Sequence, residues 1–183
     1  MKSLNTLLIL ATAFLAVFAQ AAFDFTRQLL GAQLDLLPPL MVYTSLTGNL
    51  TAVTLLAAAG GLWLDSLSAN PLGVTVLPLF IVGFALHHLR ELILREQITA
   101  QFVLGLMAGA TVPLMTVLLL LSAGHNPLLG WGSLWQLLVV SVGGGILTPI
   151  TFRYFNLLNR LLNYRPATET SFRPDREIRR GRS

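Results

Sequence analysis

Asp65 is the residue in this chain that most invites a chemical role, because it is a lone carboxylate at the end of the apolar run "GGLWLD". A hydrolase would need a nucleophile and a base beside it, and Ser66 or Ser68 with His125 would supply them in a Ser-His-Asp arrangement. No Gly-x-Ser-x-Gly turn, which would present such a serine, accompanies these residues. The sequence therefore predicts that the protein is not an enzyme.

His87 and His88 are further candidates, this time for metal-ligand chemistry. Adjacent side chains diverge by about 100° on a helix, so this pair cannot chelate one ion as histidines four residues apart do. His125 with Asp65 would give two ligands, whereas zinc sites have three or four protein ligands, and the chain contains no cysteine. We expect no metal and no other cofactor. The role of the Asp65 carboxylate must then be sought in the helices and the loop that position it.

The composition of the chain is that of a membrane protein. Of its 183 residues, 54% are hydrophobic and 11% are charged, whereas about 25% of the residues of a typical soluble domain are charged. The calculated pI of about 10.3 reflects an Arg-rich end, since eight of the 12 basic residues lie at or after position 153. The aromatic residues lie inside apolar segments, so the basic pI does not indicate a nucleic-acid-binding surface.

Four windows are long and apolar enough to cross a bilayer as single helices, which takes roughly 20 residues. They are residues 4–23, 71–89, 98–121 and 134–155. A further apolar stretch, residues 36–64, is too long for one straight crossing and has a turn signal at residues 47–49. We interpret it as a hairpin of two short helices. The sequence thus predicts an all-α, polytopic integral membrane protein with six transmembrane helices in residues 1–152.

The charge distribution predicts the orientation of these helices, because Lys and Arg in short loops favour the cytoplasmic side. With six crossings and a cytoplasmic N-terminus, the cytoplasmic basic residues are Lys2, Arg90, Arg95 and the eight distal arginines. The outer charged residues are Arg27, Asp24, Asp35 and Asp65. A single crossing in residues 36–64 would move the distal arginines outside. We therefore expect both the N- and the C-terminus in the cytoplasm.

The first apolar segment also has an interpretation as a secretory signal peptide, with Lys2 as its basic start and residues 19–21 resembling a cleavage site. Its apolar run reaches Phe23 and is about 20 residues long, beyond the roughly 7 to 15 residues of a signal-peptide core. Cleavage would leave the orientation of the other five helices unchanged. We interpret the segment as the first transmembrane helix.

Small residues spaced four apart predict where helices pack against each other in lipid. Gly105 and Gly109 form a Gly-x-x-x-Gly pair, and Ala57 and Gly61 have the same spacing. Such pairs let two helix backbones approach closely. We expect helix packing at these positions.

The loop after Asp65 predicts a structural role for its carboxylate. A carboxylate at the C-terminal end of its own helix is repelled by the helix dipole, but the next helix begins only a few residues later. Asn70 can cap that helix, Pro71 can occupy its first position, and amides near Gly73 are then available to the acid. Ser68 belongs to the same polar loop. We expect a tie of about 1 kcal/mol between Asp65 and the start of this helix.

Residues 38–91 combine a Pro-led short helix, a small turn, a Gly-rich helix ending in Leu-Asp, a serine-containing loop, Leu-Gly and a helix with a basic end. In these features they resemble the core of the rod shape-determining protein MreD family. The segment "GGGILTPITF" is also similar to the Gly-x-Leu-x-Pro segment of that family. The two stretches cover somewhat over a third of the chain, and the Arg-rich tail after Tyr164 lies outside the resemblance.

The resemblance implies a non-enzymatic, multi-pass subunit of the bacterial cell-elongation complex in the cell (inner) membrane. Members of the family are thought to work with the membrane-anchored protein MreC. Through MreC they work with the peptidoglycan glycosyltransferase and transpeptidase that build the lateral wall under MreB filaments. The resemblance assigns the partner-binding or structural motif to Gly60, Gly61, Asp65, Ser68, Asn70, Pro71 and Gly73.

The same resemblance leaves a second function open. The MreD family is similar in fold to the substrate-binding subunits of energy-coupling-factor vitamin transporters, which implies a small-molecule-binding membrane subunit as the alternative. A site for a polar substrate usually places a charge near the membrane midplane, whereas the charges of this chain cluster at the predicted membrane faces. The scaffold function is therefore favoured.

Residues 153–165 predict an amphipathic cytoplasmic helix that extends the last crossing. Its apolar residues recur at helical spacing and are Tyr154, Leu157, Leu158, Leu161 and Leu162. Arg153, Arg160 and Arg165 would then lie near anionic lipid at the inner membrane surface. Docking onto a cytoplasmic partner is the alternative. Residues 166–183 are mostly polar and Arg-rich, and we expect them to be disordered.

Overall fold

The computed structural model describes residues 2–22, 31–68, 71–93, 97–124 and 130–162, and these residues form six α-helices. The helices are α1 (Lys2–Ala22), α3 (Leu37–Thr47), α4 (Leu50–Leu67), α5 (Val76–Leu89), α6 (Ile98–Ser122) and α7 (Trp131–Leu162). The described part of the chain is therefore all-α, as predicted. Several residues of the sequence analysis lie outside the described ranges: Asp24, Arg27, Asn70, Arg95, His125, Arg165 and residues 166–183.

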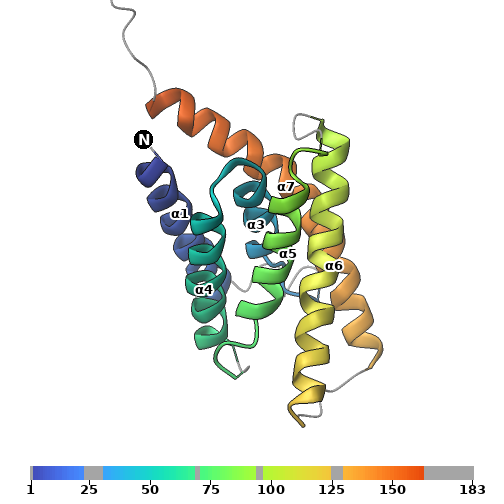
Figure 1. Ribbon diagram of the computed structural model, residues 1–183. Helices are drawn as coiled ribbons and strands as arrows, with labels where there is room; N and C mark the ends of the chain where they lie inside the picture. Colours follow the sequence, from blue (N-terminus) through green and yellow to red (C-terminus); the bar gives the residue numbers. More distant parts are fainter. Residues whose placement is uncertain (1, 23–30, 69–70, 94–96, 125–129, 163–183) are drawn as a thin grey trace, which may run out of the picture.

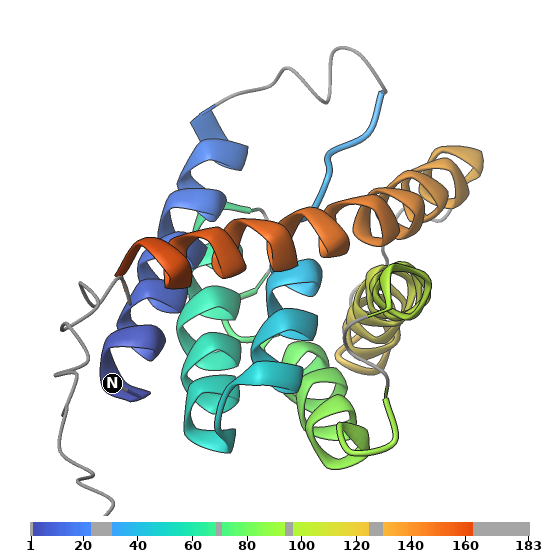
Figure 2. The same cartoon turned by 90° about the horizontal axis from the view of Figure 1, so that it is seen from above.

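Successive helices run in opposite directions, so the connections lie at two ends of the bundle (Figure 1). One end, uppermost in Figure 1, holds the α3–α4 turn, the N-terminal ends of α1 and α6, and the C-terminal ends of α5 and α7. We call it the terminal end. The C-terminal ends of α4 and α6 and the N-terminal ends of α5 and α7 lie at the opposite end, which we call the loop end. Seen from above, α7 runs across the bundle and passes over α3, which it contacts (Figure 2).

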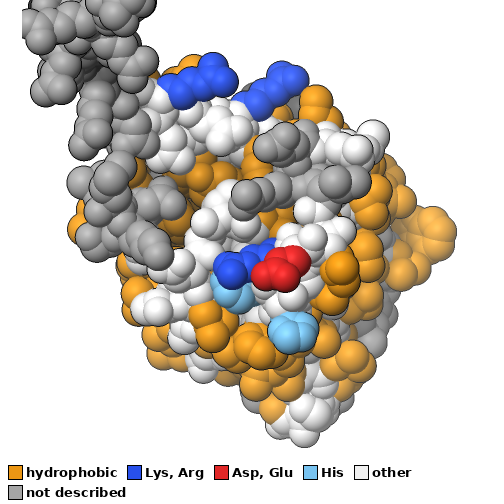
Figure 3. Space-filling view, turned by 45° about the horizontal axis from the view of Figure 1, so that its top comes forward, with side chains coloured by type: hydrophobic (Ala, Val, Ile, Leu, Met, Phe, Trp, Pro, Cys, Tyr) orange, Lys and Arg blue, Asp and Glu red, His pale blue; other side chains and the backbone are white. Residues whose placement is uncertain are grey.

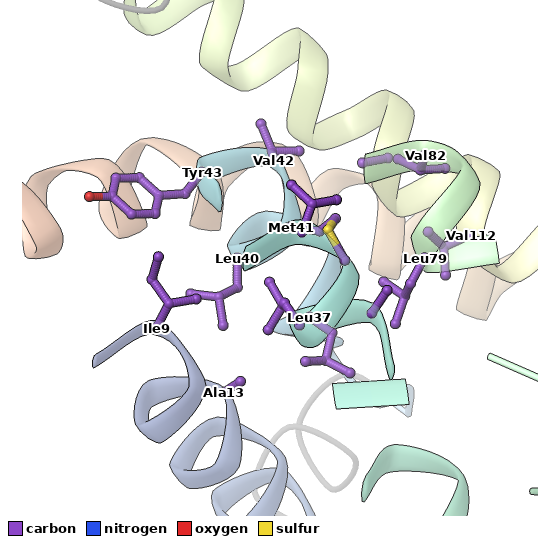
Figure 4. Packing of buried hydrophobic residues seen from close by; sticks show 14 of the residues in the cluster. Ile9, Ala13, Leu37, Leu40, Met41, Val42, Tyr43, Leu79, Val82 and Val112 are labelled. Atoms are coloured by element: carbon purple, nitrogen blue, oxygen red, sulfur yellow. The ribbon is translucent and has the colours of Figure 1, made fainter. Parts of the chain in front are cut away.

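The short helix α3 is the centre of the bundle. It contacts α1, α4, α5, α6 and α7, and all its residues from Leu37 to Leu46 are buried. Figure 4 shows the apolar side chains that surround it, and those labelled come from α1 (Ile9, Ala13), α5 (Leu79, Val82) and α6 (Val112). The sequence of α3 is apolar on every side, which is typical of a helix buried all round.

The hairpin predicted in residues 36–64 is confirmed as α3 and α4. Gly48 ends α3, and its amide donates to the Thr44 carbonyl at 2.8 Å; Asn49 directly precedes α4. Pro38 and Pro39 lie in the first turn of α3, where a missing backbone donor costs little. Helix α3, the first helix of the hairpin, is only 11 residues long, because residues 31–36 before it are not helical.

Helices α6 and α7 pack together along small residues, as predicted for Gly105 and Gly109. A Cβ atom added to Gly105 would overlap the Thr148 hydroxyl and the Gly144 carbonyl on α7. A Cβ atom on Gly109 would lie 2.8 Å from the carbonyl oxygen of Val140. The glycines therefore let the two backbones approach to a distance that any side chain would prevent.

Among the described residues, three helices are long and apolar enough to cross a membrane: residues 50–67, 98–122 and 131–161. Helices α1 and α5 are apolar as well but contain shorter apolar segments. Large apolar side chains point outward from most helices, for example Leu7, Phe84, Met107, Leu118 and Ile150. A soluble monomer rarely exposes so much apolar surface. These are the features of a membrane protein.

Helix α7 continues beyond position 155 to Leu162, and its last turns have two apolar faces. Phe152 and Phe155 are buried against Tyr43, whose ring centroid lies 5.1 and 4.3 Å from theirs, respectively. The apolar side chains of the other face are exposed by 50 to 67%: Tyr154, Leu157 and Leu161. Part of the predicted amphipathic extension thus forms one continuous helix with the last apolar segment.

Candidate functional site

Asp65 lies in the last turn of α4, and only 1% of its surface is exposed. Its Oδ2 accepts hydrogen bonds from the backbone amides of Gly73 at 2.9 Å and Thr75 at 3.1 Å. Its Oδ1 accepts a further bond from the Thr75 hydroxyl. The predicted tie between Asp65 and the segment leading to the next helix is confirmed at the Gly73 amide, and Thr75 contributes two bonds that the sequence analysis did not foresee.

The start of α5 differs from the prediction. The helix begins at Val76, and residues 71–75 form a non-helical turn, so Pro71 does not occupy its first position. Gly73 has a φ of 91°, in the left-handed region that favours glycine, and the chain reverses there. Thr75 is the N-cap residue, but its hydroxyl donates to Asp65 and does not cap its own helix. The Asp65 carboxylate therefore binds the amides that precede α5.

Two glycines of α4 permit this geometry. A Cβ atom on Gly61 would lie 2.8 Å from the Cα of Val76, and one on Gly60 would lie 3.0 Å from Leu37 Cδ2. Gly61 thus lets α4 contact the first residue of α5 through backbone atoms. Because Gly61 and Asp65 are four residues apart, they share one face of the helix. The close approach therefore places the carboxylate within reach of the amides that precede α5.

The α4–α5 connection also presents exposed side chains at the loop end. Ser66 and Ser68 are exposed, and Ser68 ends α4 by donating its amide to the Asp65 carbonyl at 3.3 Å. Two leucines are exposed beside them, Leu67 by 56% and Leu72 by 71%. We call these four residues the loop surface. Since Asp65 lies beneath them, its three hydrogen bonds hold the backbone that displays this surface.

A cavity of about 520 Å³ lies next to the Asp65 site. Its walls come from α1, the segment before α3, α4, α6 and α7. Much of the lining is aliphatic and includes Val17, Leu34, Leu64, Val112, Val117 and Val140. The polar residues of the lining are Gln20, Gln33, Asp35, Ser68, Thr75, Thr116 and Gln136. Thr75 therefore belongs both to the cavity and to the Asp65 site.

Asp35 is the titratable residue in the lining that the structure describes. It lies outside the helices, and its Oδ1 accepts a hydrogen bond from the Leu37 amide at 3.0 Å. Gln20, on the same cavity wall, has a buried Nε2 with no hydrogen-bond partner among the described residues.

Charged and imidazole side chains gather at the terminal end, as Figure 3 shows for the face that the view presents. The backbone oxygen of Ser45 accepts a hydrogen bond of 3.0 Å from His87 Nδ1, which joins α5 to α3. His88 is exposed, as are Arg153 and Arg160 on α7. Within the described residues, no three His, Asp or Glu side chains form a group that could hold a metal ion.

The cavity was not predicted from the sequence. Asp35 was considered only as an outer charge, and Gln20 only as part of a resemblance to a cleavage site. Gln20, Asp35 and Gln136 are polar residues near the outer ends of predicted apolar segments. Their predicted position at a similar depth in the membrane could have indicated a common site, but the sequence did not show that these three residues line one cavity.

The fold and the site together define a helical membrane protein with a buried carboxylate that joins two helices at one end of the bundle. The chain matches no protein-family model, and no curated protein or solved structure is significantly similar to it.

Proposed function

We propose that the chain crosses the bacterial cell (inner) membrane six times, with both termini in the cytoplasm. The alternating helix directions support this topology, because the N-terminal end of α1 and the C-terminal end of α7 lie at the same end of the bundle. The charges support the orientation. Arg90 follows α5 at the terminal end, where Arg153 and Arg160 also lie on α7, whereas Asp65 lies at the loop end.

Helix α3 alone is too short to form the second membrane crossing. The 11 residues of α3 cover about 17 Å, at about 1.5 Å per residue, which is roughly half of the hydrocarbon thickness. The non-helical residues 31–36 supply the remaining length. Ala32 in this segment is 2% exposed, and Leu34 contacts Gly143 of α7. Gly31 and Gln33 are exposed, and Gln33, Leu34 and Asp35 line the cavity. Protein therefore covers part of the segment and the cavity borders the rest, and non-helical backbone is tolerated at membrane depth where it is buried in protein or lines a cavity.

We further propose that the protein is a non-enzymatic scaffold of the cell-elongation complex, similar in role to MreD. The observation that carries this proposal is the geometry of the segment that resembles that family. Gly61 brings α4 against α5, and Asp65 then binds the amides of Gly73 and Thr75. Three of the residues that the resemblance assigned to one motif, Gly61, Asp65 and Gly73, thus form one structural unit at the loop end.

This unit suits a scaffold because it holds a surface in a fixed shape. The loop surface combines two exposed serines with Leu67 and Leu72, which are exposed by 56 and 71%. Preorganised surfaces bind more tightly because less conformational freedom is lost on binding. In this proposal an MreC-like protein docks at the loop surface and links the chain to the glycosyltransferase, the transpeptidase and, across the membrane, MreB filaments. Arg153 and Arg160 would face anionic lipid.

The proposal can be tested by depleting the protein from its host and scoring cell shape. Depletion should convert rods to round cells, and the wild-type chain should restore the rods. Leu72→Glu should accumulate normally and fail to restore the shape. Leu92→Glu is the matched control, because Leu92 is 83% exposed but follows α5 at the terminal end. Unchanged shape after depletion would refute the scaffold role, and full restoration by Leu72→Glu would refute docking at the loop surface.

A further inference from the structure

The cavity at the loop end has the size and composition of a small-molecule site. Its volume of about 520 Å³ falls within the roughly 300 to 1,000 Å³ of ligand pockets, which are mostly apolar with a few polar groups. Val112 and Val117 of α6, Val140 of α7 and Leu64 of α4 contribute apolar side chains to this lining. These side chains form an apolar part of the lining that a hydrocarbon or ring could contact.

The polar groups of the cavity define what else its ligand must carry. The Gln20 Nε2 is buried and has no hydrogen-bond partner among the described residues, so it needs an acceptor. Asp35 accepts a single hydrogen bond from the described residues, on Oδ1, so its carboxylate needs a donor. Neither Lys nor Arg occurs in the described lining. An anionic group would thus meet an acid and no cation.

We propose that this cavity binds a small amphiphile whose polar end carries an N–H donor, as an ammonium or an amide, and whose body is apolar. The donor group pairs with Asp35, an acceptor such as an amide oxygen meets the Gln20 side chain, and the apolar body lies against the valines of α6 and α7. Phosphate and carboxylate ligands are rejected. This site goes beyond the scaffold function proposed above and does not depend on it.

Binding can be measured with four probes that share one apolar body and differ at the polar end: hexylamine, hexanamide, hexanoate and hexyl phosphate. The full chain in lipid nanodiscs is titrated with each probe, and saturation-transfer NMR gives the Kd. We expect hexylamine and hexanamide to bind at least about tenfold more tightly than hexanoate and hexyl phosphate, since the acid repels anions. Equal binding of all four probes, or binding of none, would overturn the proposal.

Variants locate the probe in the cavity. Asp35→Asn keeps an oxygen for the Leu37 amide, so the variant should fold. It should weaken hexylamine about tenfold while leaving hexanamide within about threefold. Gln20→Leu should weaken hexanamide, which offers an acceptor to the Gln20 amide. Glu91→Gln and Gln97→Leu are the matched controls, because both residues are exposed and neither lines the cavity. Equal effects in controls and cavity variants would place the probe elsewhere and refute the site.

A lipid and a free metabolite could both carry this chemistry, and native mass spectrometry separates the two sources. A retained mass that disappears on delipidation and returns with host lipids identifies a lipid. A mass that returns only with the aqueous host extract identifies a soluble molecule. In both cases Asp35→Asn should lower the occupancy, and unchanged occupancy in that variant would contradict the proposed contact.

Discussion

Replacement of Asp65 by alanine should destabilise the protein by about 3 kcal/mol. The change leaves two amides, those of Gly73 and Thr75, without the acceptor that they have at 2.9 and 3.1 Å. Each buried amide left without a partner costs about 1–3 kcal/mol, and relief from burying the charge offsets part of the sum. The expected loss exceeds the 1 kcal/mol expected from the sequence, because the carboxylate is buried and accepts three hydrogen bonds.

Asp65→Asn separates the hydrogen bonds from the charge. The asparagine oxygen can occupy the position of Oδ2 and keep both amide bonds, while its amide group faces the Thr75 hydroxyl, which can accept. The bonds to a neutral oxygen are weaker than those to a carboxylate. We therefore expect a loss of about 1 kcal/mol for this variant.

Reversible unfolding in SDS, followed by tryptophan fluorescence, measures both losses, since Trp63 lies two residues before Asp65 on α4. Ser66→Ala is the control, because Ser66 is exposed and its hydroxyl donates to the Trp63 carbonyl of its own helix; its effect should stay within about 0.5 kcal/mol. The reasoning fails if Asp65→Ala is as stable as Ser66→Ala. It also fails if Asp65→Asn is as damaging as Asp65→Ala.

Two further predictions concern packing and topology. Gly105→Ala should cost at least about 2 kcal/mol in the same SDS assay, because its Cβ would overlap α7; Gly132→Ala, whose Cβ meets open space, should be neutral, and equal losses would refute the packing argument. Fusion of a reporter that is active only outside the cytoplasm should give a signal after Ser68 and none after Arg165, whereas a signal after Arg165 would exclude six crossings.

Local features of the fold could be predicted because each depends on residues close together in the sequence. The turn at Gly48 and Asn49 divided the apolar stretch correctly into α3 and α4. Gly105 and Gly109 indicated the packing of α6, although their spacing does not specify α7 as the neighbour. The tie at Asp65 could be foreseen because only a short loop separates the acid from the amide of Gly73.

Other features depend on tertiary packing and could not be predicted. Pro71 followed by helix-compatible residues suggested a helix start, but the chain first turns at Gly73 so that amides reach Asp65, and α5 begins at Val76. That α3 has only 11 residues could not be predicted, because apolar composition does not distinguish a short buried helix from a full membrane crossing. The cavity requires Gln20 and Asp35 to face one space, and periodicity within single segments carries no information about that arrangement.

The central claim is the role of this protein as a scaffold for wall synthesis, and the most direct measurement is the identity of its partners. The tagged full-length chain is crosslinked in its host, purified in mild detergent and analysed by mass spectrometry. The account predicts an MreC-like membrane-anchored protein together with the peptidoglycan glycosyltransferase and transpeptidase, and a loss of these partners from Leu72→Glu but not from Leu92→Glu. Recovery of an energy-coupling ATPase without any wall-synthesis protein would contradict the scaffold role and establish the small-molecule transport subunit instead.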